Sequence, residues 1–463
     1  MRGGSGLSDF IVMKRLVVLN VVGLTKGLLG EKLPRIKKFA AGKETSSFRP
    51  AFPAVTTTAQ ATYLTGCPPS EHGIVGNGWY EREEAEVRFW KQSNHLVHGE
   101  KLWEAVRRER EGFRCAKMFW WYNMYSSADY SVTPRPMYPA DGRKIFDVYT
   151  HPLTMREALK GDLGDFPFPS FWGPRAGIPC SQWIADSAKW IEEREEPDLN
   201  LVYLPHLDYG LQKWGPGASE MDVEYEAIDR LVGDLIHYFE KRAVEVVLLS
   251  EYGISKVNEP IHLNRIFRQK GWLQIKEELG LELLDAGACQ AFAVADHQVA
   301  QIYVNDSSIH DEVRTVLEAT DGVEEVRENC FGDGIGGRRG GDFVVISRPE
   351  AWFTYYYWED DDLAPDFART IDIHRKPGYD PAELFIDPAI CCPQLKVAKF
   401  LLKKKLGFRG LLDVIPLEAS LVQGSHGRDD VPEDEQPVLI GAGADVVDSA
   451  EGVFDYLKAR CLP

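Results

Sequence analysis

The chain has 463 residues, of which 44% are hydrophobic and 27% are charged. These proportions are typical of a soluble globular protein with one large domain or two to three ordinary ones. The formal net charge of −18 argues against nucleic acid and against an anionic membrane surface as partners, because both are negatively charged.

No transmembrane span is predicted, and the sequence does not indicate an oligomeric state. The eight cysteines show no CxxC pair and no regular spacing, a pattern that fits neither a zinc ribbon nor a dense disulfide framework. We therefore expect a reducing compartment and a cytoplasmic location.

The first predicted element is a buried strand within "MKRLVVLNVVGL", Met13 to Leu24. Residues 1–13 show no periodicity and are expected to form a flexible lead. Basic residues before an apolar run also imitate a signal peptide. The run is short, Asn20 interrupts it and no small-x-small cleavage site follows, so the strand is favoured.

Further strand-like runs end at Leu204 and Ser250, and each is predicted to be followed by a loop with polar residues. Predicted helices at Gly99–Glu111, Ser181–Glu195 and Met221–Arg242 separate the runs. This alternation indicates an α/β fold with a mostly parallel sheet and helices on both faces. Ligands of such sheets bind beyond the carboxyl ends of the strands, where the polar residues stand.

Between residues 276 and 384 the sequence changes to short strand-like segments with one helical segment at Asp311–Thr320. This pattern predicts an inserted, smaller α+β domain that is cap-like. The segments "LIGAG" and "VFDYLKARC" then return to the earlier pattern. We therefore expect a core made of residues 14–275 and 385–463.

The strand-end segments are "FPAVTTT" with "TYLTGCPPSEHGIVGN", "PHLDYGLQKWGP", "LLSEYGI" and "GSHGRDD". Their order and spacing resemble the type I phosphodiesterase / nucleotide pyrophosphatase family, of the alkaline phosphatase superfamily. The resemblance implies an alkaline-phosphatase-like sheet, two metal ions that are usually zinc, and a threonine nucleophile that forms a covalent phosphothreonine.

Carried over residue by residue, the resemblance puts the nucleophile on Thr56 and the phosphate-binding asparagine on Asn77. An isolated "TTT" would instead indicate a strand end and a helix N-cap, the role left to Thr57 and Thr58. The family's metal ligands are depleted: Asp208 and His426 are kept, whereas Val22, Gln212, Glu251 and Tyr252 stand in place of aspartate, histidine, aspartate and histidine.

One of the two metal sites keeps only Thr56 and Glu251 as donors, too few for a transition ion, and is expected to be absent. Asp208, Glu251 and His426 are the predicted ligands of one divalent ion, either zinc, manganese or magnesium. A protein that requires no metal is the alternative.

The remaining candidates follow the same strand ends. His206 is predicted as a general base or replacement ligand, and Tyr252 as a hydrogen-bond donor to a phosphate or leaving group. Tyr209 and Gln212 are expected to contact substrate. Arg375 and Lys376, in "DIHRKPGYDP", form either an anion clamp or a loop held to the acidic surface.

These residues give three hypotheses. The first is a divergent hydrolase of a small phosphate ester or diphosphate, with Thr56 as nucleophile. The second is an enzyme with the same pocket whose Tyr252, His206 and Glu251 perform metal-poor, non-hydrolytic acid–base chemistry on an organic substrate. The third is a non-catalytic binding protein. Polar replacements at three of the four changed positions weigh against simple decay.

Overall fold

A computed structural model describes residues 14–141 and 143–462. The predicted flexible lead, residues 1–13, lies outside the described residues. None of the helices in the described ranges combines the length and the apolarity that crossing a membrane requires.

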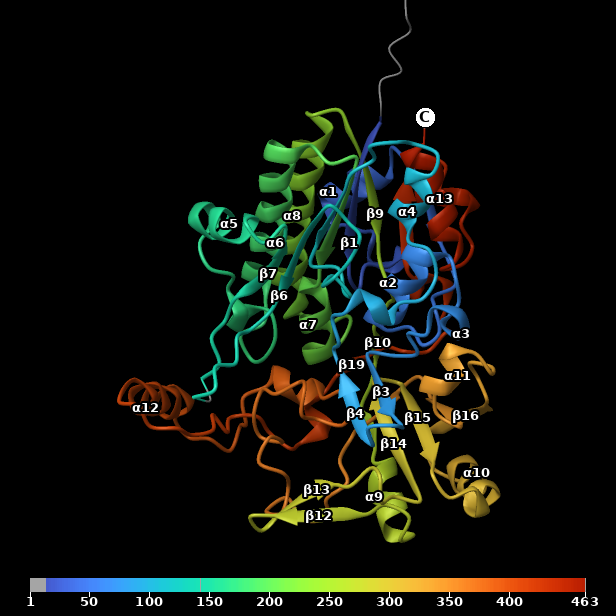
Figure 1. Ribbon diagram of the computed structural model, residues 1–463, viewed down its shortest axis with the longest axis vertical. Helices are drawn as coiled ribbons and strands as arrows, with labels where there is room; N and C mark the ends of the chain where they lie inside the picture. The colour runs from blue at the N-terminus through green and yellow to red at the C-terminus, as the bar shows by residue number, and fades with distance from the viewer. Residues whose placement is uncertain (1–13, 142, 463) are drawn as a thin grey trace, which may run out of the picture.

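An eight-stranded sheet organises the core, and it confirms the predicted α/β class (Figure 1). Its five strands β9, β1, β8, β5 and β6 are parallel, whereas β7 at one edge and β20 and β2 at the other side run antiparallel to their neighbours. Strands β1 and β8 are buried on both faces, which explains their nearly continuous apolar sequences. In spatial order the strands are β2 (Glu44–Ser47), β20 (Val438–Gly441), β9 (Val244–Leu249), β1 (Arg15–Val21), β8 (Leu199–Leu204), β5 (Cys115–Met118), β6 (Tyr130–Pro134) and β7 (Val148–His151).

Helices cover both faces of this sheet. Helices α1 (Pro34–Ala40), α6 (Ile178–Glu195) and α8 (Met221–Glu240) pack together on one face. Helices α2 (Thr56–Thr65), α4 (Leu102–Arg107) and α13 (Gly452–Cys461) pack on the other. The predicted helix at 99–111 is shorter in the structure, Leu102–Arg107, and at its start Glu104 Oε2 accepts from the backbone N–H of Lys101 at 2.9 Å. The remaining core helices are α3 (Pro69–His72), α5 (Met155–Leu163) and α7 (His206–Trp214).

A second, four-stranded antiparallel sheet lies below the core in Figure 1. All four strands fall inside the predicted insert, although the exact domain boundaries stay a prediction. Each sheet has its own large apolar core cluster. The second sheet runs β14 (Ala291–Asp296), β15 (Val299–Val304), β17 (Phe343–Ser347) and β16 (Val323–Glu328), accompanied by α9 (Leu263–Gln269), α10 (His310–Glu318) and α11 (Ile335–Arg339).

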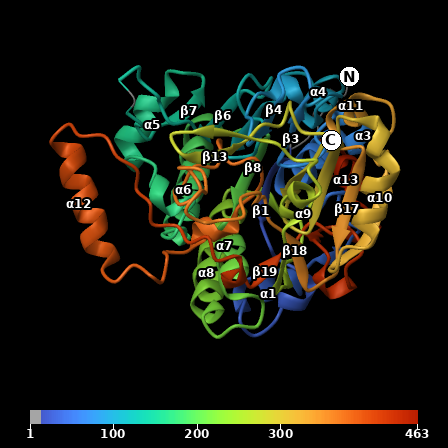
Figure 2. The same cartoon turned by 90° about the horizontal axis from the view of Figure 1, so that it is seen from below.

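Short strand pairs and one outlying helix complete the described chain. Two of the pairs join segments that are far apart in sequence, β10 (Ser255–Lys256) with β19 (Gly424–Ser425) and β11 (Glu259–Ile261) with β18 (Ala351–Phe353). The other pairs are the hairpins β3 (Gly78–Glu81) with β4 (Glu86–Phe89) and β12 (Ile275–Glu278) with β13 (Leu281–Leu284). Helix α12 (Pro393–Lys405) lies at the periphery of the molecule, as Figure 2 shows from below.

Candidate active site

Thr56 is the first residue of α2, directly after Val55 in extended conformation. The hydroxyls of its two neighbours donate to backbone carbonyls, Thr57 to Gly76 at 2.7 Å and Thr58 to Ile74 at 3.1 Å. These bonds fasten the helix start to the "HGIVGN" segment. Only the first of the three threonine hydroxyls therefore faces the side chains at the strand ends.

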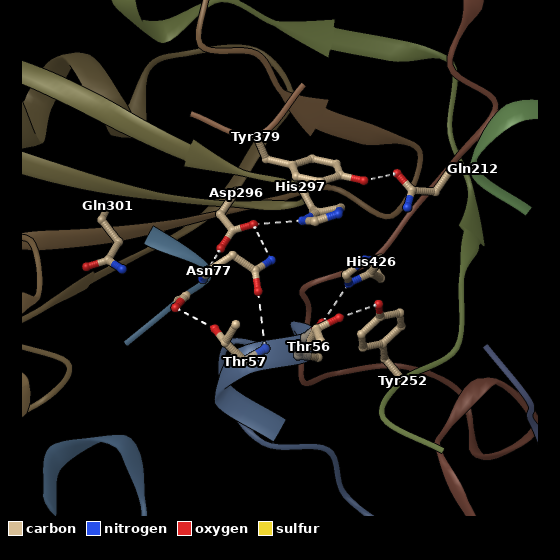
Figure 3. Close-up of polar contacts among 12 residues, drawn as sticks. Thr56, Thr57, Asn77, Gln212, Tyr252, Asp296, His297, Gln301, Tyr379 and His426 are labelled. Atoms are coloured by element: carbon tan, nitrogen blue, oxygen red, sulfur yellow. Dashed lines mark hydrogen bonds and ion pairs between the residues drawn. The ribbon is translucent and has the colours of Figure 1, made fainter. Parts of the chain in front are cut away.

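A chain of hydrogen bonds leads away from the Thr56 hydroxyl, and Figure 3 shows its first and last bonds, Thr56 with Tyr252 and Tyr379 with Gln212. Its Oγ1 lies 3.0 Å from the phenol oxygen of Tyr252. Tyr252 donates to Asp208 Oδ1 at 3.2 Å, and Gln212 Nε2 donates to Asp208 Oδ2 at 2.7 Å. The hydroxyl of Tyr379 donates in turn to Gln212 Oε1 at 2.9 Å. A hydroxyl proton on Thr56 thus has a connected path to a buried carboxyl group.

The residues after β8 form a helix, α7, and not the loop that the sequence suggested. Asp208 and Gln212 are four residues apart and therefore lie on one face of α7, toward Thr56. His206 points elsewhere, with Nε2 2.9 Å from Glu224 Oε2 of α8. It lines a cavity of about 30 Å³ together with Tyr209. The helix thus separates two groups of residues that the sequence grouped together.

Asp296, at the end of β14, is a site residue that sequence reasoning missed. Its Oδ2 accepts from the backbone N–H of Asn77 at 2.8 Å, and its Oδ1 accepts from Asn77 Nδ2 at 3.1 Å and pairs with His297 Nδ1 at 2.8 Å. Asn77 Oδ1 accepts from the backbone N–H of Thr57 at 3.2 Å. The second sheet therefore holds the predicted phosphate-binding asparagine in place.

Four aromatic rings form a column that connects the two halves of the site. The ring centroids of Tyr252 and His426 are 3.6 Å apart, those of His426 and His297 3.8 Å, and those of His297 and Tyr379 3.6 Å. We call the connected set the Thr56 network; its members are Thr56, Asn77, Asp208, Gln212, Tyr252, Asp296, His297, Tyr379 and His426. All nine side chains are buried.

Both histidines of the column are neutral, because burial lowers the pKa of each well below its ordinary value. The Nδ1 atom of His426 lies 2.7 Å from the carbonyl oxygen of Ala54, and that of His297 lies 2.8 Å from Asp296. Each Nδ1 therefore carries the proton, and each Nε2 carries a lone pair. Neither Nε2 has a hydrogen-bond partner among the described residues.

Burial also raises the pKa values of three carboxyl groups: Asp208 to about 7, Asp296 to about 6 and Glu251 to about 8. Glu251 lies at the end of β9 and its Oε1 accepts from Asn20 Nδ2 and Gln60 Nε2, both at 2.6 Å. Because desolvation disfavours the charged forms, these groups hold protons at a pH where exposed carboxyls would not.

The predicted anion clamp has no free charge at this site. Lys376 is buried and its Nζ lies 2.7 Å from carboxylate oxygens of both Asp380 and Glu383. Arg375 is largely exposed and pairs with Asp372 at 3.4 Å. In the part of the chain that the structure describes, no lysine or arginine side chain bonds to the Thr56 network.

The donor atoms around Thr56 do not fit a divalent metal ion. Val22 has no donor, and the Gln212 amide oxygen already accepts from Tyr379. The remaining pair is His426 Nε2 and Asp208 Oδ1, which are 3.8 Å apart. The described residues include no group of three or more His, Cys, Asp or Glu side chains placed to hold a metal, so the predicted set of Asp208, Glu251 and His426 is not assembled.

Comparisons with known proteins agree with the fold and the motif. The family model of the type I phosphodiesterases / nucleotide pyrophosphatases matches residues 16–380. An uncharacterized pyrophosphatase/phosphodiesterase of Schizosaccharomyces pombe is 26% identical over 230 residues, 47% of this chain and 40% of that protein. Human ectonucleotide pyrophosphatase/phosphodiesterase family member 1 is 23% identical over 51% of this chain and 23% of its own length. The match thus spans less than half the length of these relatives.

Two solved structures share the fold at low identity. Murine ectonucleotide pyrophosphatase/phosphodiesterase 5, as an inactive variant in complex with AMP, has a TM-score of 0.58 at 13% identity and covers 97% of this chain and 95% of its own. Phosphonoacetate hydrolase from Sinorhizobium meliloti, in complex with phosphonoformate, has a TM-score of 0.60 at 14% identity and covers 97% and 96%. With the family model matched over most of its length, the chain belongs to the type I phosphodiesterase / nucleotide pyrophosphatase family.

Proposed function

We propose that the protein hydrolyses a phosphodiester of a small molecule, with Thr56 as the nucleophile. The observation that carries this proposal is the path from Thr56 Oγ1 through the Tyr252 phenol to Asp208. A threonine hydroxyl is a weak nucleophile until a base removes its proton. A carboxyl group with a pKa of about 7 is suited to that task near neutral pH.

In the proposed first step Thr56 Oγ1 bonds to phosphorus, and the bond from phosphorus to the leaving alkoxide breaks. The threonine proton passes to the Tyr252 oxygen while the Tyr252 proton passes to Asp208, so the phenol ends uncharged. The leaving alkoxide takes a proton from solvent. In the second step a water oxygen bonds to phosphorus and the bond from phosphorus to Thr56 Oγ1 breaks. The proton held by Asp208 returns through Tyr252 to Thr56, and the phosphomonoester leaves with the remaining protons of the water.

The phosphoryl oxygens need hydrogen-bond donors that are already in place. The N-terminus of α2, a helix of 10 residues, presents the positive end of its dipole at Thr56. The Nδ2 atom of Asn77 has two hydrogens, of which one points to Asp296. The other hydrogen remains to donate to a phosphoryl oxygen, so the clamp by Asp296 orients the amide for that purpose.

The charges around Thr56 favour a substrate with a single negative charge. A phosphodiester carries one charge at neutral pH, whereas a phosphomonoester carries close to two. The network contains two carboxyl groups, Asp208 and Asp296, and bonds to no lysine or arginine among the described residues. A second negative charge would be buried without a counter-ion, which costs more than one charge shared among hydrogen-bond donors.

We further propose that this reaction does not require the single zinc, manganese or magnesium ion that the sequence suggested. Support comes from the partners of the donor atoms: Asn20 and Gln60 hold Glu251, and Tyr379 holds the amide of Gln212. Tyr252 stands at a position where the family has a metal-binding histidine, and its phenol contacts the threonine hydroxyl directly.

The second candidate is acid–base chemistry on an organic group that leaves phosphorus untouched. It is favoured by the free Nε2 lone pairs of His297 and His426, which are buried beside Asp208 and Asp296. Asp208 and Asp296, with pKa values raised to about 7 and about 6, suit proton abstraction, and the two Nε2 atoms can accept a hydrogen bond from a neutral or singly charged ligand. A binding protein without catalysis is the third outcome that the experiment below distinguishes.

The test is hydrolysis of bis(4-nitrophenyl) phosphate compared with 4-nitrophenyl phosphate, in chelator and with zinc, manganese or magnesium added. We expect the diester to be the better substrate and the chelator to leave the rate unchanged. Thr56→Ala should lower the diesterase rate on the order of 1,000-fold, whereas the matched Thr58→Ser should retain it. Full activity in Thr56→Ala, or no activity in the wild type under every condition, would overturn the proposal.

A further inference from the structure

Helix α12 is the one long helix among the described residues that contributes no buried residue to a core. It lies apart from the layers of the molecule in both views (Figures 1 and 2). Val397, on its inner side, packs against a small cluster of Ala382, Val414 and Ile415. The opposite side is open, so its composition is not explained by packing within this chain.

The outer side of α12 is apolar. Leu395, Ala398, Leu402 and Leu406 follow one another at steps of three and four residues, so they form one stripe along the helix. The three leucines are 69%, 60% and 66% exposed. Phe408, just beyond the helix, is a further exposed apolar side chain, at 66%. Exposed leucines in such a row are unusual for a surface that faces only water.

Positive charge borders this stripe on both sides. Helical spacing puts Lys399 and Lys403 along one edge and Lys405 along the other. Residues 393–412 contain five lysines, one arginine and no acidic residue, in a chain of formal net charge −18. Lys396 pairs with Asp413 at 2.9 Å, and no described carboxylate pairs with Lys399, Lys403, Lys404 or Lys405.

We propose that α12 is an interfacial helix that docks this protein on a membrane surface containing anionic lipids. The leucine stripe would enter the boundary between headgroups and acyl chains, and the lysines would extend their charged ends to the phosphate and carboxylate headgroups. Each basic side chain near such a surface adds electrostatic attraction.

The total charge of −18 does not prevent this contact. Electrostatic attraction is screened beyond a distance of about 8 Å at physiological ionic strength, so the membrane responds to the nearest charges and not to the total. Helix α12 stands at the edge of the molecule, which lets it touch a surface before the acidic body does. The expectation drawn from net charge alone is therefore replaced by one drawn from where the charges lie.

A second copy of the chain is a weaker explanation for the same surface. Two α12 helices packed through their leucine stripes would bring Lys399, Lys403 and Lys405 of each copy close to those of the other. Like charges at such a seam are destabilising. An anionic lipid surface satisfies both the stripe and its lysine border.

The experiment is co-sedimentation of the full chain with vesicles of phosphatidylcholine alone and of phosphatidylcholine with phosphatidylserine. We expect binding to the anionic vesicles that is at least about tenfold stronger and that weakens with added salt. The variant Leu395→Gln/Leu402→Gln/Leu406→Gln and the variant Lys399→Gln/Lys403→Gln/Lys405→Gln should each lose about tenfold in partitioning.

Matched controls are Leu279→Gln, at a leucine that is fully exposed on the β12–β13 hairpin, and Lys241→Gln/Lys270→Gln, at exposed lysines elsewhere. Both should bind as the wild type does, and circular dichroism checks that all variants are folded. Equal binding by all proteins, or no binding to either vesicle, would overturn the proposal. A leucine variant that dissociates a dimer in analytical ultracentrifugation, without altered vesicle binding, would assign the stripe to a second copy instead.

Discussion

The Thr56 network and helix α12 are opposite in character. The network gathers polar side chains in the interior, where eight of the nine make hydrogen bonds to one another. Helix α12 gathers leucines on the exterior, where they contact little of the chain. In each region the side chains stand in surroundings that their chemistry normally avoids.

What each region leaves unpaired indicates what it binds. Inside, the unpaired atoms are the Nε2 lone pairs of His297 and His426, which suit a polar ligand. Outside, the unpaired surface is the leucine stripe with its lysine border, which suits an amphipathic one. The comparison thus separates a site for chemistry from a site for attachment, and the predictions below test that separation.

After Thr56→Ala itself, the largest effect is expected from Tyr252→Phe, which removes the only link between Thr56 and Asp208 that the described hydrogen bonds provide. The diesterase kcat should fall about 100-fold. In the wild type, Asp208 acts as a base only when ionised, so kcat/KM should rise with pH and level off above its pKa of about 7.

The hydrogen bond from Tyr252 lowers the Asp208 pKa, so the inflection of the Tyr252→Phe profile should move to higher pH. The control is Tyr456→Phe, at a buried tyrosine of α13 outside the network. An unchanged rate and an unchanged inflection in Tyr252→Phe would contradict the proposed proton path.

A smaller effect is expected from Asp296→Asn, because Asp296 is a positioning residue that acts through Asn77 and His297. Asp296 accepts from the backbone N–H of Asn77, from Asn77 Nδ2 and from His297 Nδ1. An asparagine amide would place its own hydrogens against one of these donors, so kcat/KM should fall about tenfold. The double variant with Asn77→Ala should lose little more than Asn77→Ala alone, since the two residues share one function. Asp311→Asn, on the exposed side of α10, is the control. If the losses of the two single variants added up in the double variant, the proposed positioning of Asn77 by Asp296 would be contradicted.

The protonation of Glu251 is expected to affect the free energy of unfolding and not the catalytic rate. Burial raises its pKa from 4.5 to about 8, so the folded chain holds a proton that the unfolded chain releases over that interval. The free energy of unfolding should therefore fall as pH rises from 4.5 through 8.

Glu251→Gln keeps an oxygen to accept from Asn20 and Gln60 and has no proton to lose. Relative to the wild type it should gain about 1–3 kcal/mol at pH 9, with the gain disappearing near pH 5, in urea titrations. Glu312→Gln, on an exposed helix, serves as the control. A wild type whose stability rises between these pH values would contradict the assignment.

The last prediction is that two variants cause no change, which tests whether the site for chemistry and the site for attachment are separate. The triple leucine variant of α12 should retain kcat/KM toward a diester in solution within about twofold, the usual range for surface changes. Conversely, Thr56→Ala should bind anionic vesicles as the wild type does. If either variant impaired both properties, attachment and chemistry would share one structural unit.

Much of the core was predictable from local pattern. The α/β class follows from short-range signals, namely the apolar runs of β1, β8 and β9 and the helical spacing of α6 and α8. The structure confirmed it. The amphipathic pattern of residues 393–406 is equally local, and its leucine and lysine spacing could have indicated an interfacial helix. The net charge of the whole chain instead argued against a membrane surface as a partner, so this local pattern was not used.

The candidate site was only half predictable. The motif identified Thr56 and Asn77, but Asp296 lies 219 residues from Asn77 in a hairpin turn whose sequence, "ADHQ", is ordinary. The separation of Asp208 from His206 depended on a helix where a loop was expected. The partners of Lys376 likewise depended on how its loop folds back.

The sequence by itself determined the order of strands and helices and the identity of the family, because both rest on patterns within short segments and on the order of those segments in the chain. Only the tertiary structure decided which carboxyl groups face the Thr56 hydroxyl, which histidines are buried and neutral, and which leucines stay exposed. Protonation, burial and hydrogen bonding depend on neighbours from distant segments, and those neighbours exist only once the two sheets have come together.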